Sequence, residues 1–217
     1  MKSVRRFTQN VRRLIPIGAF ALVVSTLAVQ PLAAEKHKIQ FDLFPNPKVV
    51  DCLGTKDGPT PKARATVTRG PLNDTLVITA KNLKPRLAFD MFTVERSFLL
   101  SDGSIDPNFT TFGLAWYQSD LHADEDGKFT ATIKTILLDQ IFGFDPDVAL
   151  TPLNTFHVGF WFNNPKSAKD CGFDVTHPTP FNGEHKAGPV AMISVPDPDT
   201  NLGPLCTKPN DDGTCNP

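Results

Sequence analysis

Hydrophobic and polar residues alternate along most of this chain with a period of two, which is the period of a β-strand with one face buried. The clearest alternation is in residues 155–163, TFHVGFWFN. One face of this strand would hold Phe156, Val158, Phe160 and Phe162, and the other would hold His157, Gly159 and Trp161. The segment therefore predicts a strand whose more apolar face lies against a core.

Seven further stretches have strand character and are separated by clusters of Gly, Pro, Asn and Asp. They are residues 38–44, 62–69, 75–83, 87–95, 112–121, 128–136 and 189–194. Helical periodicity is nearly absent, and only residues 137–143 would form a turn or two of helix. We therefore expect an all-β domain over residues 35–195, an antiparallel β-sandwich of about eight strands, with a barrel as the alternative.

The end of the chain differs in composition from this domain. The last 40 residues contain eight prolines, from Pro178 to Pro217. Proline lacks a backbone donor and is excluded from the middle of a sheet. Residues 196–217 are therefore predicted to be a Pro-rich tail that runs extended over the surface.

The first 34 residues have the order of a secretory signal peptide. Five basic residues come first, an apolar run from Leu14 to Val29 follows, and Ala33-Ala34 offers a cleavage site. The run is short for a membrane-spanning helix, although an uncleaved N-terminal anchor is the alternative. Cleavage would place the protein outside the cytoplasm, secreted or periplasmic.

Cleavage after residue 34 would change the net charge of the chain. Loss of five cationic residues would leave 17 Lys and Arg against 23 Asp and Glu, a net charge of −6. This balance predicts an acidic surface with no basic stripe, which argues against binding to nucleic acid or to anionic membranes. We expect an extracellular or periplasmic ligand or protein as its partner, and no transmembrane segment in the mature chain.

All four cysteines follow the predicted cleavage site, and an even number in an oxidising compartment favours two disulfides. Of the three possible pairings we expect Cys52–Cys171 with Cys206–Cys215. The second pair encloses a short stretch rich in turn residues, which folds back easily. A metal–thiolate cluster is disfavoured because no C-x-x-C spacing occurs.

Asp124-Glu125-Asp126-Gly127 resembles the start of a calcium-binding loop. If Gly127 is placed at position 6 of such a loop, His122 and Ile133 occupy positions 1 and 12, where oxygen ligands are needed. A tight turn between the strands at 112–121 and 128–136 accounts for every residue, since Asp-Gly favours positive φ.

The histidines suggest a metal site as one candidate. His157, His177 and His185 lie within 29 positions, and Glu184 precedes His185. Three imidazoles, or two imidazoles and a carboxylate, are ligand sets for zinc or copper. Their spacing matches no recognised metal motif, so exposed loop histidines are the alternative interpretation.

Aromatic residues suggest a second candidate. Trp116, Tyr117 and Trp161 could bind a ligand such as a sugar by stacking, provided that they face solvent. The alternative is that Trp161 fills a second buried layer, because Trp is well buried on average.

The chain has no G-x-S-x-G, H-E-x-x-H, P-loop or dinucleotide-binding motif. The sequence therefore favours a non-catalytic binding or interaction module. The alternative is a metal-binding protein or metal-dependent enzyme that uses His157, His177 and His185.

Overall fold

The computed structural model describes residues 38–70, 73–135, 156–179 and 186–206, together with Asp211 and Cys215. All of them belong to one compact unit, Glu35–Pro217. The eight strands are β1 (Lys38–Pro45), β2 (Lys62–Thr68), β3 (Asp74–Lys81), β4 (Ala88–Val94), β5 (Ala115–His122), β6 (Phe129–Thr135), β7 (His157–Phe162) and β8 (Val190–Ser194). Two short helices, α1 (Val50–Leu53) and η1 (Pro165–Cys171), complete these elements.

The predicted strands are therefore present, and the all-β class is confirmed. The predicted signal peptide and the predicted helical turn at 137–143 lie outside the described residues. None of the helices in the described ranges is long and apolar enough to cross a membrane.

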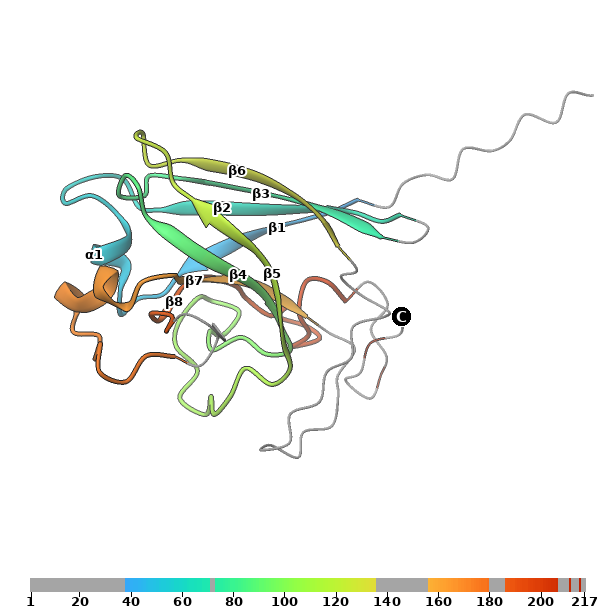
Figure 1. Ribbon diagram of the computed structural model, residues 1–217. Coiled ribbons are helices and arrows are strands. Elements are labelled where there is room, and N and C mark those ends of the chain that lie inside the picture. Colours follow the sequence, from blue (N-terminus) through green and yellow to red (C-terminus); the bar gives the residue numbers. More distant parts are fainter. Residues whose placement is uncertain are drawn as a thin grey trace, which may run out of the picture. The chain divides into compact units, whose positions relative to one another are not determined.

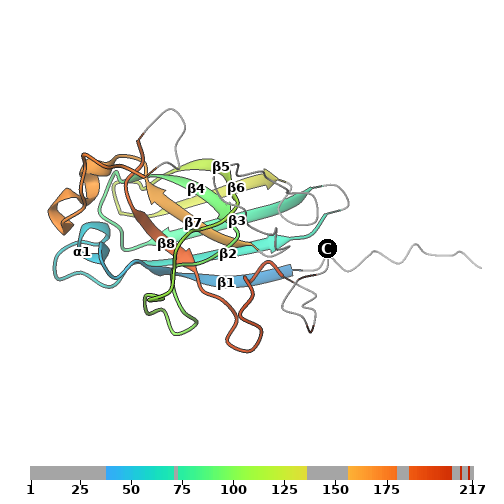
Figure 2. The same cartoon turned by 90° about the horizontal axis from the view of Figure 1, so that it is seen from below.

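The eight strands form one antiparallel sheet in the order β5-β4-β7-β8-β1-β2-β3-β6. The sheet curls until its edge strands β5 and β6 come near each other, so it is nearly barrel-shaped, as in the barrel alternative (Figures 1 and 2). β1 pairs with β2 on one side and with β8 on the other. The first and last strands are therefore neighbours at the centre of the sheet.

The inner face of the sheet encloses the main core. Alternate residues of β1, β2, β3 and β6 point inward, and Phe156, Val158, Phe160 and Phe162 all belong to this core, as their spacing predicted. The ring centroids of Phe89 and Phe160 lie 4.9 Å apart in an edge-to-face arrangement. This geometry is favourable for aromatic pairs.

A second apolar cluster covers the outer face of β4, β7 and β8. The loop of residues 96–114 passes over these strands and places Phe112 with its ring centroid 5.1 Å from that of Trp161. Phe92 of β4 lies 5.4 Å from the same indole. Strand β7 is therefore buried on both faces, and all six of its residues are buried.

A buried carboxylate fixes the base of this loop. Glu95 is 1% exposed, and its Oε2 accepts a hydrogen bond from the backbone N–H of Leu114 at 3.1 Å. Its Oε1 lies 3.2 Å from Nη2 of Arg96. Gly113 has a φ of +70°, and a Cβ there would overlap Glu95 Oε2. Only glycine fits this position without displacing the carboxylate.

Asp124–Gly127 forms a turn, as predicted, but the two strands that it joins do not pair with each other. β5 pairs with β4 and β6 pairs with β3, so this turn connects the two edge strands of the sheet. Asp124 Oδ1 accepts hydrogen bonds from the backbone N–H groups of Asp126 and Lys128 at 2.9 and 2.8 Å. Gly127 has a φ of +68°, and a Cβ there would overlap the Leu83 carbonyl oxygen.

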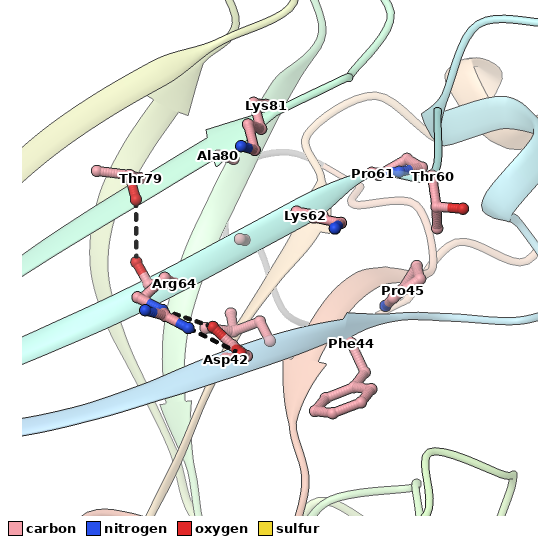
Figure 3. Close-up of a pocket in the computed structure, with 12 residues that line it drawn as sticks. Asp42, Phe44, Pro45, Thr60, Pro61, Lys62, Arg64, Thr79, Ala80 and Lys81 are labelled. Atoms are coloured by element: carbon pink, nitrogen blue, oxygen red, sulfur yellow. Dashed lines mark hydrogen bonds and ion pairs between the residues drawn. The ribbon is translucent and has the colours of Figure 1, made fainter. Parts of the chain in front are cut away.

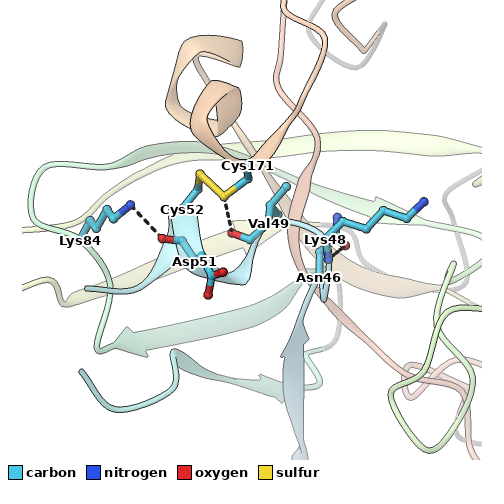
Figure 4. The surroundings of a disulfide bond; sticks show 7 residues. All are labelled: Asn46, Lys48, Val49, Asp51, Cys52, Lys84 and Cys171. Carbon is cyan, nitrogen blue, oxygen red and sulfur yellow. Dashed lines mark hydrogen bonds between the residues drawn. A yellow bond between two sulfur atoms is a disulfide. The ribbon is translucent and has the colours of Figure 1, made fainter. Parts of the chain in front are cut away.

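Both predicted disulfides are present, Cys52–Cys171 and Cys206–Cys215. The first links α1 to η1 across 119 residues and holds these two helices together (Figure 4). Two disulfides indicate folding in an oxidising, extracellular type of compartment.

The segment after β8 is more deeply embedded than the predicted surface tail. Leu202 and Leu205 are 5% and 1% exposed, and Leu205 belongs to the main core. Asp197 Oδ1 accepts hydrogen bonds from the backbone N–H groups of Asp199 and Thr200, both at 3.0 Å, and this bends the chain inward.

Candidate functional site

Exposed aromatic side chains gather on strand β5, at one edge of the sheet. Trp116 is 48% exposed and Tyr117 is 49% exposed, whereas most other aromatic side chains in the described ranges are at least partly buried. These two residues were predicted to bind a ligand, and the structure places both at the surface. Large exposed aromatic groups are the usual anchors of binding sites.

Trp161 is separated from them. It is 0% exposed and packs between Phe92 and Phe112 in the second apolar cluster. Trp161 thus occupies the second buried layer, which was the alternative interpretation, and it does not present its ring to solvent. It supports the site indirectly, because the ring of Phe92 also lies 5.6 Å from that of Tyr117.

An irregularity in the pairing of β4 with β5 gives the site its geometry. The register shifts between Met91 and Phe92, so that these residues face Ser119 and Tyr117. Gln118 is therefore the extra residue of a β-bulge. In a regular strand, residues 117 and 120 would lie on opposite faces, because their separation is odd. The bulge brings Tyr117 and Asp120 together, and the Tyr117 hydroxyl donates a 2.8 Å hydrogen bond to Asp120 Oδ1.

Asp120 also lies opposite a second carboxylate, on the neighbouring strand β4. Its register partner on β4 is Asp90, which is 1% exposed and accepts a 2.8 Å hydrogen bond from Nδ2 of Asn163. Like charges in directly opposite positions destabilise a sheet. Within this pair Asp90 is buried and held by Asn163, so Asp120 is the carboxylate that solvent reaches.

The electrostatics keep the Tyr117 phenol protonated. Partial burial, the hydrogen bond to Asp120 and the nearby Asp90 raise the pKa of Tyr117 to about 12. The phenol therefore acts as a donor at every physiological pH. Asp120 is exposed, and its carboxylate has capacity to accept further hydrogen bonds.

The residues predicted as metal ligands do not form a metal centre within the described part of the chain. His157 is 3% exposed, and its Nδ1 donates a 3.1 Å hydrogen bond to the Ser194 carbonyl oxygen. Its burial lowers its pKa to about 4. His177 is exposed, and its Nδ1 lies 2.7 Å from Oδ2 of Asp174.

Glu184 and His185 lie outside the described residues, so that part of the metal prediction stays untested. Among the residues that the structure describes, no group of three or more His, Cys, Asp or Glu side chains is arranged to hold a metal ion. The Asp174 carboxylate beside His177 has its pKa lowered, first by the Thr176 hydroxyl and then by His177. This exposed cluster is an ordinary turn with its side-chain hydrogen bonds.

Sequence reasoning missed Asp90, Gln118, Asp120 and Asn163. The two aspartates belong to segments that were correctly predicted as strands, but the register that pairs them and the bulge at Gln118 leave no trace in a single sequence. Comparison with protein-family models, with curated proteins and with solved structures finds no match to this chain.

Proposed function

We propose that this chain is an exported, non-catalytic binding module that holds a carbohydrate along strand β5. The observation that carries the proposal is the bulge, which places the Tyr117 phenol and the Asp120 carboxylate side by side on one face of an edge strand, while the exposed indole of Trp116 lies on the other face of the same strand. Aromatic faces pack against the apolar face of a sugar ring, and a carboxylate accepts hydrogen bonds from its hydroxyl groups.

Export is supported by two kinds of observation. The N-terminal segment 1–34 has the basic, apolar and small-residue order of a signal peptide, and the remaining chain contains two disulfides. We infer that residues 1–34 are removed and that the binding site faces a secreted or periplasmic environment.

A non-catalytic role is supported by the burial of the polar groups that resemble catalytic ones. His157 Nδ1 lies 3.1 Å from Ser194 Oγ, but both residues are at most 3% exposed, and the hydroxyl oxygen accepts a hydrogen bond from the backbone N–H of Val158. A nucleophile needs access to its substrate. This pair holds β7 to the end of β8 and is a structural element.

Binding to a panel of neutral polysaccharides, measured by affinity electrophoresis, tests the proposal. We expect at least one polysaccharide to retard the mature protein, and Trp116→Ala and Asp120→Asn each to weaken this retardation about ten-fold. Leu100→Ala is the control, because Leu100 is also an exposed large hydrophobic residue, 38% exposed, but belongs to the loop of residues 96–114 and not to β5.

Two results would contradict this function. Retardation by none of the neutral polysaccharides would remove the proposed ligand class. Release of new reducing ends by the wild-type protein, abolished in Asp120→Asn, would instead make the Asp90–Asp120 pair part of an enzyme.

A further inference from the structure

The outer face of β1, β2, β3 and β6 differs from every other face of the sheet that the structure describes, because it is bare and positively charged. Side chains alternate strictly between core and solvent in these strands. Five cationic residues point outward, namely Lys38, Lys62, Arg64, Lys81 and Lys134, against one carboxylate, Asp42. The whole chain has a net charge of −1, so this concentration of positive charge is local.

Hydroxyl groups occupy most of the remaining outward positions of the same face. They belong to Thr66, Thr68, Thr75, Thr79, Thr130 and Thr132. Cross-strand pairing places Thr79 between Arg64 and Thr130, in one row across three strands. The face therefore offers donors and cations in an ordered array, with neighbouring strands about 4.8 Å apart.

A groove of about 650 Å³ lies at one end of this face, over β1, β2 and β3. Lys62, Lys81, Arg64 and Thr79 contribute polar side chains to it, and Thr60-Pro61 forms its end (Figure 3). Its volume lies within the range of small-molecule sites.

The charges within the groove are only partly compensated. Asp42 accepts hydrogen bonds from Nε and Nη2 of Arg64 at 2.7 and 3.1 Å, so this carboxylate is already used. The Arg64 hydrogen bond, followed by the nearby positive charges, lowers the pKa of Asp42. Lys62 and Lys81 are direct cross-strand partners, and within the described ranges no ion pair or hydrogen bond reaches either ammonium group. Their mutual repulsion destabilises the free protein.

We propose that this groove and the threonine rows beside it bind a linear anionic polysaccharide, with Lys62 and Lys81 on either side of one carboxylate or sulfate group. The anion removes the repulsion between the two lysines. The Thr79 hydroxyl donates to the Arg64 carbonyl oxygen, so it accepts a hydrogen bond from a ring hydroxyl, and the neighbouring threonines exchange further hydrogen bonds with ring hydroxyls. The strands that extend beyond the groove provide room for further sugar units.

The composition of the face favours a polysaccharide over other polyanions. Single-stranded nucleic acids are held by stacking of bases on aromatic side chains, and the outward positions of these four strands include one aromatic residue, Phe44, at the end of the groove. Binding to an anionic membrane needs apolar side chains that enter the lipid. Rows of threonine provide neither aromatic rings for stacking nor apolar side chains for insertion into lipid. Their hydroxyl groups can form hydrogen bonds with the hydroxyl groups along a polysaccharide.

The test uses the mature protein with polygalacturonate and dextran sulfate as anionic probes and dextran as the neutral one. We expect wild-type protein to bind at least one anionic probe at low salt, to lose affinity as salt increases, and not to bind dextran at this face. The double variant Lys62→Gln/Lys81→Gln should bind at least ten-fold more weakly. Both side chains are exposed, so circular dichroism should show the wild-type fold.

Lys166→Gln/Lys169→Gln is the matched control, because it removes the same charge from two exposed lysines of η1. It should change affinity less than two-fold. Equal losses in the two double variants would overturn the proposal, since the net charge alone would then explain binding. Tighter binding to single-stranded DNA or to vesicles with anionic lipid would also overturn it.

The inference does not depend on the β5 site. Trp116→Ala should leave binding of the anionic probe unchanged. If that variant loses the anionic probe as strongly as the Lys62/Lys81 variant does, the groove is not a separate site and the proposal fails.

Discussion

Strand β7 is buried on both faces, whereas β2, three strands away in the same sheet, is buried on one. The difference comes from the loop of residues 96–114, which covers the outer face of β4, β7 and β8 with aromatic side chains. No described segment covers β1, β2, β3 and β6 in this way. One half of the sheet therefore has two apolar layers, and the other half has one apolar layer and an open polar face.

The two halves of the sheet differ in what their outer side chains contribute to stability. The covered half gains stability from a second core at the cost of an accessible surface. The bare half keeps threonine and lysine side chains in solvent, where they contribute little to folding and are available to a ligand. The β5 site lies at the margin of the covered half, where Tyr117 contacts Phe92.

The largest expected effect is the loss of the indole at the centre of the second cluster. Trp161→Ala should reduce the free energy of unfolding by about 3–5 kcal/mol, because it leaves a cavity between Phe92 and Phe112. Val77→Ala, on the bare face of β3, should cost less than about 1 kcal/mol. Urea denaturation measures the free energy of unfolding of both variants. Equal losses would show that the two outer faces are packed equally well.

The next effect is the pH dependence of the free energy of unfolding that results from His157, a residue of the covered half. Burial lowers its pKa to about 4, whereas in the unfolded chain it has the usual value of about 6.5. Between these two values the unfolded state binds more protons, so stability falls as the pH decreases from 6.5 towards 4, by about 1.4 kcal/mol per pH unit at most.

The variant His157→Asn tests the origin of this slope. Asparagine keeps a donor for the Ser194 carbonyl oxygen but does not titrate, so the unfolding free energy should vary less between pH 4 and 6.5 than in the wild type. An unchanged slope would assign the effect to other groups.

The smallest effect belongs to the bare face. Lys81→Gln removes the repulsion with Lys62, and we expect a small rise in the melting temperature at low salt that disappears at high salt. Lys169→Gln, on η1, provides the comparison. A fall in the melting temperature of Lys81→Gln would mean that Lys81 stabilises the free protein and is not held there for a ligand.

Much of this architecture follows from local patterns in the sequence. The period-two alternation of residues 155–163 predicted the strand and the face of each side chain, and cysteine positions predicted both disulfides. The start of β5 was predicted too early, at residue 112, because Phe112 belongs to the loop that packs on Trp161. An apolar residue that covers a neighbouring strand has the same character as one within a strand.

The candidate sites were harder to predict because they depend on register. A β-bulge brings Tyr117 and Asp120 together. Asp90 lies opposite Asp120 because β4 pairs with β5, and β5 begins 21 positions after β4 ends in the sequence. The basic face was hidden for a simpler reason. Its lysines alternate with core residues along each strand, so no basic run occurs in the sequence and the net charge suggested an acidic surface.

The central position of β8 beside β1 has a consequence for the order of folding. β8 is the only strand that connects the group β5-β4-β7 to the group β1-β2-β3-β6, and it is the last of the eight strands in the chain. Before β8 has joined the sheet, the two groups have no shared ladder, and β1 has one free edge. The sheet is therefore completed after its other seven strands are present, and a chain truncated before Val190 would lack the ladder between the two groups and would expose the edges of β7 and β1, which favours aggregation.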